Sequence, residues 1–119
     1  ISAFAACVPL VATKLGEDGA MARRGAAPPI SLSAPAVAVV DTVGAGDCFD
    51  AGFVYGFLNG WDPRRALQLG IACGSLSTRR AGGTDSQPRL EEAMRFIEGA
   101  CPEGSVGTTG EGRPWPRDP

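Results

Sequence analysis

The first third of the chain consists of short apolar runs separated by turns rich in glycine and proline. Residues 9–15 form one such run, after an apolar N-terminal stretch that indicates the end of a helix, and residues 20–24 form another. The turn between them, at residues 16–19, has glycine at both ends, which suits a tight reversal of the chain. The pattern predicts a β-hairpin, then a loop at residues 25–29 and a short edge strand at residues 30–32.

The middle of the chain changes from a strand pattern to a helix pattern. Residues 36–40 form the nearly continuous apolar run Ala-Val-Ala-Val-Val, which is typical of a strand covered on both faces. Phe49, Phe53 and Phe57 then recur every four residues and would share one face of a helix. This spacing predicts a helix over residues 47–59.

A second helix is predicted immediately afterwards. Asp62 suits the N-cap and Pro63 the first helical position, and apolar residues continue the pattern towards Arg80. Gly70 and Gly74 lie four residues apart within it, and each costs about 1 kcal/mol of helix propensity relative to alanine. Close approach by a neighbour would offset this cost. A neighbouring helix is favoured over a flat ligand in that role.

The last part of the chain contains a polar loop, one more helix and a tail. Residues 81–87 form the loop, and Pro88 opens an amphipathic helix that ends near Gly99. The 18 residues from Pro102 onward contain four prolines and four glycines with few apolar groups. We therefore expect residues 101–119 to be disordered.

Composition narrows the possible functions. The chain has 119 residues, of which 44% are hydrophobic, so one small domain can form a core. A net charge of −2 gives no electrostatic reason to expect nucleic-acid binding. No apolar stretch is long enough to span a membrane, so we expect a soluble, cytoplasmic protein. The sequence contains no histidine, which leaves carboxylates as the candidate bases.

The four cysteines do not form a recognisable site. Cys7, Cys48, Cys73 and Cys101 are separated by 41, 25 and 28 residues, so no C-x-x-C pair is available for zinc or redox chemistry. A disulfide framework is not expected at this spacing. Cys48 and Cys73 lie in apolar helical patterns and are predicted to be small buried hydrophobic residues.

A glycine-rich stretch, residues 41–52, joins the predicted strand to the predicted helix. Such a turn can direct several backbone N–H groups at one point, and the helix N-terminus adds partial positive charge there. This arrangement predicts a site for an anion, most often phosphate. Asp47 lies at the mouth of this site. A carboxylate is not needed to bind phosphate and would repel it, so its presence is explained if it accepts a proton from a hydroxyl that attacks the phosphate. The alternative is that Asp47 simply caps the helix.

This stretch also carries a family resemblance. Asp-Thr-x-Gly-Ala-Gly-Asp-x-Phe, followed by Ala-Gly, resembles the C-terminal signature of the ribokinase family, the PfkB-type carbohydrate kinases. In that family the second aspartate is the catalytic base, and the Gly-Ala-Gly amides form an anion hole for the transferred phosphoryl group. The resemblance implies these roles for Asp47 and for Gly44, Ala45 and Gly46.

Further segments resemble the family's nucleotide site. Residues 14–19 are similar to the segment, commonly Thr-Leu-Gly-x-x-Gly, that borders ATP, with Lys14 where many members have threonine. Lys14 could reach a phosphate or could be a solvated side chain, and the glycines could serve the hairpin alone. Residues 71–74 resemble the element that lines the adenine pocket, and residues 81–84 resemble the turn that closes it. The implied nucleotide-binding residues are Lys14, Leu15, Gly16, Glu17, Asp18, Gly19, Gly46, Asp47, Cys73, Gly82 and Gly83.

Many members of the family bind a monovalent cation beside the anion hole, and K⁺ is therefore a possible cofactor. The resemblance implies Asp41 and the carbonyl of Val43 as ligands, with Gly82 and Ser86 as weaker candidates. Oxygen-only ligands suit such a hard cation. Asp41 could also initiate the turn by accepting hydrogen bonds from its own backbone, which is compatible with cation binding.

The resemblance covers about Val8 to Gly99, the C-terminal portion of a family member. It implies an α/β fold in which residues 1–100 form part of a ribokinase-like domain, with a parallel sheet, flanking helices and a β-hairpin. The implied activity is phosphoryl transfer from ATP and Mg²⁺ to a sugar hydroxyl.

The sugar-binding N-terminal half of the family has no counterpart in this sequence. The alternative is therefore a non-catalytic nucleotide- or anion-binding remnant, or an interaction module. A second copy of the chain or a separate N-terminal half would be the partner that covers the exposed part of the sheet.

Overall fold

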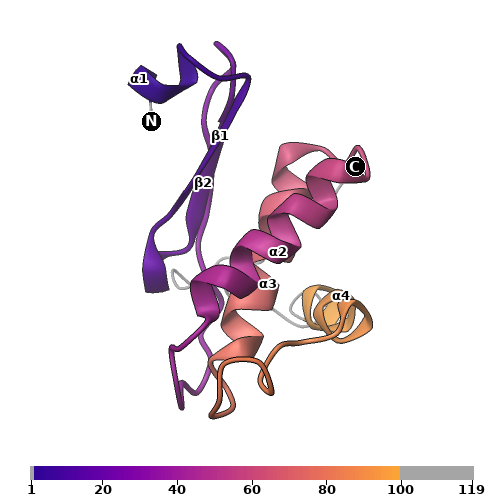
Figure 1. The fold of residues 1–119 in the computed structure, drawn as a ribbon. Helices are drawn as coiled ribbons and strands as arrows, with labels where there is room; N and C mark the ends of the chain where they lie inside the picture. Colours follow the sequence, from indigo (N-terminus) through magenta and orange to yellow (C-terminus); the bar gives the residue numbers. More distant parts are fainter. Residues whose placement is uncertain (1, 100–119) are drawn as a thin grey trace.

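A small antiparallel sheet lies beside a pair of packed helices, and a further helix packs on the second helix of that pair (Figure 1). The computed structural model describes residues 2–99, so the predicted tail lies outside the described residues. No helix in this part of the chain is long and apolar enough to cross a membrane. The elements are α1 (Ser2–Ala5), β1 (Leu10–Lys14), the 3₁₀ turn η1 (Gly16–Asp18), β2 (Ala20–Arg24), β3 (Ile30–Leu32), α2 (Ala45–Leu58), α3 (Pro63–Ser77) and α4 (Leu90–Gly99).

The predicted hairpin and edge strand are confirmed. β1 pairs antiparallel with β2, so that Lys14 lies opposite Ala20, and β3 pairs antiparallel with the other edge of β2. The connection is closed by a hydrogen bond of 2.9 Å from the Leu15 amide to the Gly19 carbonyl. Gly16 and Gly19 both have positive φ, at 60° and 99°, which explains why glycine stands at both ends of this turn.

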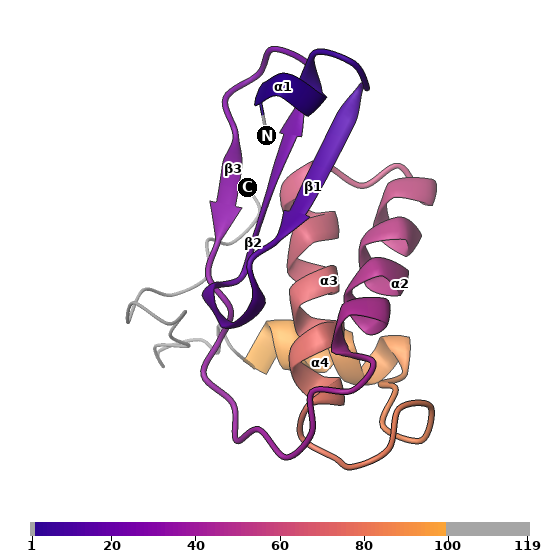
Figure 2. The same ribbon diagram turned by 60° about the vertical axis from the view of Figure 1, so that its left-hand side comes forward.

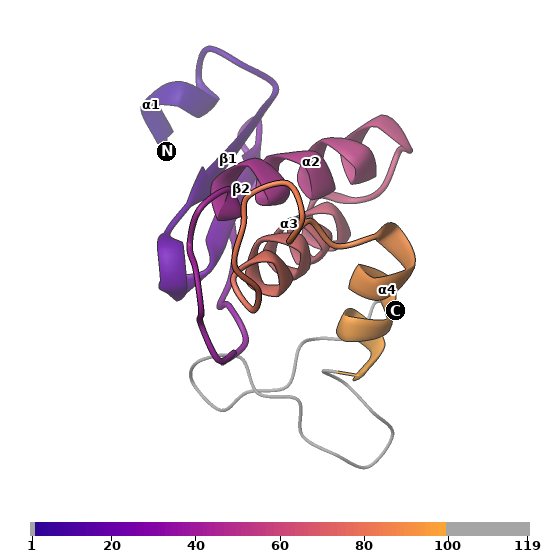
Figure 3. The same ribbon diagram turned by 60° about the horizontal axis from the view of Figure 1, so that its bottom comes forward.

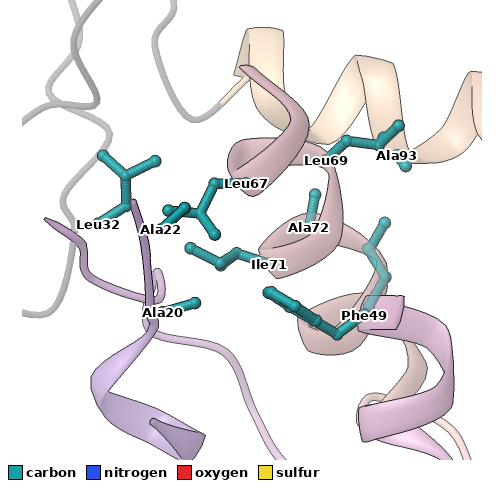
Figure 4. Close-up of a cluster of buried hydrophobic side chains, with 10 residues drawn as sticks. Ala20, Ala22, Leu32, Phe49, Leu67, Leu69, Ile71, Ala72 and Ala93 are labelled. Atoms are coloured by element: carbon teal, nitrogen blue, oxygen red, sulfur yellow. The ribbon is translucent and has the colours of Figure 1, made fainter. Parts of the chain in front are cut away.

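The core lies between one face of the sheet and α3. Ala20 and Ala22 point from β2 towards the helix and are fully buried, and Leu67 and Ile71 of α3 pack against them (Figure 4). Two small side chains on the strand let the helix approach closely, so the larger aliphatic groups of α3 fill the layer. This packing fixes the orientation of the end of β1 towards the start of α2.

Helices α2 and α3 lie side by side and pack closely at positions occupied by glycines (Figure 2). A Cβ built on Gly52 would lie 2.9 Å from the Cys73 Sγ, and one built on Gly70 would lie 3.0 Å from the Phe49 ring. A Cβ on Gly74 would lie 3.1 Å from the Ala45 carbonyl oxygen. The close approach predicted for the glycines of α3 is therefore confirmed, and a helix makes it.

The predicted helix caps are confirmed, but some helix ends are shifted. Asp62 accepts a hydrogen bond of 2.7 Å from the Arg64 amide, and Pro63 is the first residue of α3. α2 begins two residues before Asp47, because Gly44 in the left-handed conformation serves as its N-cap. α3 ends at Ser77 rather than at residue 80, and α4 begins two residues after the predicted Pro88.

The strand predicted at residues 36–40 is wrong. This segment is irregular in the structure, and Val39 and Val40 are 59% and 65% exposed. The amides of Val40 and Asp41 both donate to the Thr78 carbonyl, at 2.7 and 3.1 Å, which ties the segment to the end of α3. A strand forms only where a neighbouring strand can pair with it, and the segment makes its backbone hydrogen bonds to this helix end instead.

The predicted parallel sheet is also wrong for the part of the chain that the structure describes. All strand pairs among residues 2–99 are antiparallel. Parallel strands need a crossover connection between them, and the connections within this sheet are too short for one. The α/β class is nevertheless confirmed by the combination of a small sheet with helices packed on one face.

Candidate functional site

The turn before α2 leaves three backbone amides free at the helix N-terminus. Gly44 has φ 79° and ψ −1°, a left-handed conformation that turns the chain into the helix. The Ala45 amide donates to the Thr42 carbonyl at 3.2 Å, and the Cys48 amide donates to the Gly44 carbonyl at 2.9 Å. Within residues 2–99 the amides of Gly44, Gly46 and Asp47 have no hydrogen-bond partner. They are the donors that this turn offers to an anion.

Asp47 lies at the same end of the helix as the free amides. It is the third residue of α2, and its side chain is exposed. The arrangement therefore combines hydrogen-bond donors for an anion with an ionised oxygen that can accept a proton.

Gly44, rather than Gly46, is the residue that the turn requires to be glycine. Positive φ is found at Gly44, whereas Gly46 has an ordinary helical conformation. A Cβ built on Gly46 would meet only the Lys14 Nζ, at 3.3 Å, and that flexible side chain can move. The backbone conformation of this turn therefore does not require glycine at position 46.

Asp41 ties the turn to the loop between α3 and α4, and the two segments lie together in Figure 3. Its Oδ1 accepts a hydrogen bond of 2.9 Å from the Val43 amide, and its Oδ2 accepts one of 3.3 Å from the Gly82 amide. These bonds hold the pKa of the Asp41 carboxyl below its ordinary value of 3.8, and the bond from Val43 has the larger effect. The carboxylate is therefore charged at neutral pH and joins two segments that are distant in sequence.

Replacement of Asp41 by asparagine should change how stability responds to acid. A group whose pKa is lowered by folding stabilises the protein above its unfolded pKa, and this contribution is lost as the pH falls through the folded pKa. We expect Asp41→Asn to be less stable than the parent near pH 7 and the difference to shrink below pH 3.8. Urea unfolding between about pH 3 and pH 7 measures this.

The control for this experiment is Glu98→Gln, which removes an exposed carboxylate from α4. Its stability relative to the parent should not follow the same pH profile. If the difference in unfolding free energy between the parent and Asp41→Asn were the same at both ends of the pH range, the role of the charged carboxylate would be contradicted.

The loop that carries Gly82 and Ser86, two of the implied cation ligands, packs on this junction. Ser86 is 2% exposed, its hydroxyl donates to the Gly83 carbonyl at 3.1 Å, and its amide donates to the Gly82 carbonyl at 3.1 Å. A Cβ on Gly44 would lie 3.5 Å from the Gly83 carbonyl oxygen, so this loop packs directly on the turn. Asp41 and Ser86 thus lie on two segments that pack against each other.

Lys14 is exposed and forms an ion pair with α2. Its Nζ lies 3.0 Å from the Asp50 Oδ2 and 3.4 Å from the Gly46 carbonyl oxygen. The ammonium also lies 6.0 Å from the centre of the Phe49 ring. The last residue of β1 is thereby attached to the first turn of α2. Sequence reasoning missed Asp50, because nothing in the local pattern pairs it with a residue 36 positions earlier.

The other predicted nucleotide-binding residues are distributed around this end of the fold. Leu15, Glu17 and Asp18 are exposed in and around η1, next to Lys14 in the chain. Cys73 lies in the interface between α2 and α3, against Gly52. Its burial raises the pKa of the thiol to about 11, so the sulfur is neutral at pH 7.

Comparisons with known proteins identify a family of carbohydrate kinases. A model of the pfkB family of carbohydrate kinases matches residues 2–90. A 2-dehydro-3-deoxygluconokinase from Bacillus subtilis (strain 168) is 38% identical over 87 residues, which cover 73% of this chain and 27% of that protein. The chain spans 25–32% of the length of the curated relatives that it matches.

Solved structures of ribokinases share the fold. A ribokinase from Arabidopsis thaliana, complexed with ribose and ATP, matches with a TM-score of 0.71 and 33% identity over 75% of this chain and 29% of that chain. A putative ribokinase II from E. coli, in complex with ATP and Mg²⁺, matches with a TM-score of 0.72 and 36% identity over 76% of this chain and 29% of that chain. The sheet and helices described above are thus a portion of a ribokinase-like fold. The chain belongs to the pfkB family of carbohydrate kinases.

Proposed function

We propose that this chain is the ATP-side portion of an ATP-dependent carbohydrate kinase, which transfers a phosphoryl group to a sugar hydroxyl. The observation that carries the proposal is the set of free amides, on Gly44, Gly46 and Asp47, beside the exposed Asp47 carboxylate. Membership in the pfkB family supports it, and so do the ATP complexes of the two structural relatives.

Asp47 is proposed as the general base. The attacking hydroxyl would lose its proton to the carboxylate while its oxygen forms a bond to the γ-phosphorus of ATP, and the bond from that phosphorus to the bridging oxygen of ADP breaks. The proton passes to Asp47, and ADP leaves with the electron pair of the broken bond. A positioned base of this kind contributes typically about 10²–10⁴-fold to the rate.

The turn is proposed to stabilise the charge of the transferred group. The Gly46 and Asp47 amides donate to its oxygens, and the helix dipole adds partial positive charge. Gly44 and Ala45 shape the turn, because Gly44 supplies the left-handed conformation and the Ala45 amide closes it onto Thr42.

The nucleotide is proposed to lie between the segment Lys14–Gly19 and the loop that carries Gly82 and Gly83. Mg²⁺ would neutralise phosphate charge. Among residues 2–99 no group of three or more acidic or cysteine side chains could hold a metal ion, which fits an ion held mainly by the phosphates of the nucleotide. K⁺ would be held by the oxygens of Asp41, Val43, Gly82 and Ser86.

The experiment that tests this function measures ADP formation from ATP and Mg²⁺ by the protein that contains this chain. The acceptors would be a panel of ribose, 2-dehydro-3-deoxygluconate and other sugars and sugar acids, and calorimetry would measure ATP binding in parallel. We expect binding of ATP and acceptor-dependent release of ADP. Failure to bind ATP would overturn the proposal, and binding without turnover on any acceptor would contradict the kinase activity.

A further inference from the structure

An ammonium group and a carboxylate lie beside the free amides of α2. Gly46, Phe49 and Asp50 occupy one face of the first turn and a half of this helix, and the Lys14 side chain contacts all three. Lys14 is the last residue of β1, and the hairpin turn that begins after it is the segment proposed to border the nucleotide. One side chain therefore connects the proposed nucleotide segment to the proposed phosphoryl site.

The pair is unsuited to a purely stabilising role. Its side chains are 44% and 56% exposed, and exposed ion pairs contribute about 0–1 kcal/mol to stability. The pair matters more for the charge at the proposed anion site than for stability, because Asp50 lies one turn from the amides that would bind an anion. Without a counter-charge this carboxylate would repel phosphate.

We infer that Lys14 is a positioning residue rather than a direct phosphate ligand: it neutralises Asp50 and holds the first turn of α2 against the end of β1. This inference rests on the proposed function for the identity of the anion, a nucleotide phosphate. The attachment itself is a property of the protein without ligand. The two parts can therefore be measured separately.

The attachment is tested by amide hydrogen exchange without nucleotide. The Cys48 amide, which closes the first turn by donating to the Gly44 carbonyl, reports opening of this turn. Loss of the pair should speed its exchange by about two- to fivefold in both Lys14→Met and Asp50→Asn. Arg95→Met, which removes one positive charge from an exposed pair on α4, is the control and should leave this exchange unchanged. Unchanged exchange in Lys14→Met would overturn the attachment, whether or not the protein binds nucleotide.

The charge balance is tested by calorimetry of ATP binding to the same protein. Lys14→Met leaves Asp50 unpaired and should weaken ATP binding by about three- to tenfold, less so at high salt. Lys14→Met/Asp50→Asn removes both charges and should return the affinity to within about twofold of the parent. Lys14→Arg should retain most of the affinity.

The double variant distinguishes the possible roles of Lys14. A direct phosphate ligand would be lost in both variants, so affinity that stays low in Lys14→Met/Asp50→Asn would overturn the inference. If the parent itself binds no ATP while the exchange result holds, the proposed function fails and the attachment stands.

Discussion

Replacement of Asp47 by asparagine is expected to lower turnover by about 10²–10⁴-fold, the usual contribution of a general base, while ATP affinity stays close to that of the parent. Asparagine has nearly the same shape and keeps its backbone amide at the helix N-terminus, so the donors of the anion site remain. Only the capacity to accept a proton is lost. Steady-state kinetics of ADP release and calorimetry of ATP binding measure the two quantities.

Glu98→Gln is the matched control for the loss of one carboxylate. It lies on α4, away from the start of α2, and should leave both quantities unchanged. Parental turnover in Asp47→Asn would show that the carboxylate only caps the helix. A large fall in affinity without a fall in the rate at saturation would assign Asp47 to binding instead.

Gly19→Ala is expected to have the largest effect on stability. Gly19 has φ 99° and ψ −132°, a conformation open essentially to glycine alone. A Cβ there would collide with the Leu32 carbonyl oxygen and lie 2.7 Å from the Ser33 Cα. Strain and overpacking together should cost about 2–6 kcal/mol of unfolding free energy, measured by urea denaturation.

Gly16→Ala separates the two causes. Gly16 also has positive φ, at 60°, but nothing lies within 4 Å of a Cβ built there. Only backbone strain remains, and we expect a loss of about 1–2 kcal/mol. Equal losses at the two positions would mean that the collision with β3 is relieved at little cost, and that the packing of the hairpin against β3 is looser than described.

Local chemistry in the sequence was sufficient to predict many of the elements. Glycines at both ends of residues 16–19 predicted the hairpin, and Asp62 with Pro63 predicted the start of α3, because each feature depends on conformational preferences of a few adjacent residues. The signature from Asp41 to Phe49 indicated the family for the same reason, since its residues are contiguous.

Other features were decided only by packing. The apolar run at residues 36–40 suggested a buried strand, but β pairing requires a partner, and this segment bonds to Thr78 instead. The two candidate glycines of the turn look equivalent in sequence, and only the backbone path into α2 shows that Gly44, not Gly46, needs a left-handed conformation.

The candidate site likewise combines features that the local sequence predicts with features that only packing decides. Its central residues, Gly44 to Asp47, are adjacent in the chain and could be identified from the sequence. The contacts that hold these residues in place could not be identified from the sequence, because the Asp41–Gly82 and Lys14–Asp50 contacts join residues 41 and 36 positions apart. Such contacts exist only after the sheet, α2 and α3 have packed around shared small residues. The sequence by itself therefore determined which groups are candidates for the chemistry, and the tertiary structure decided which charges surround them.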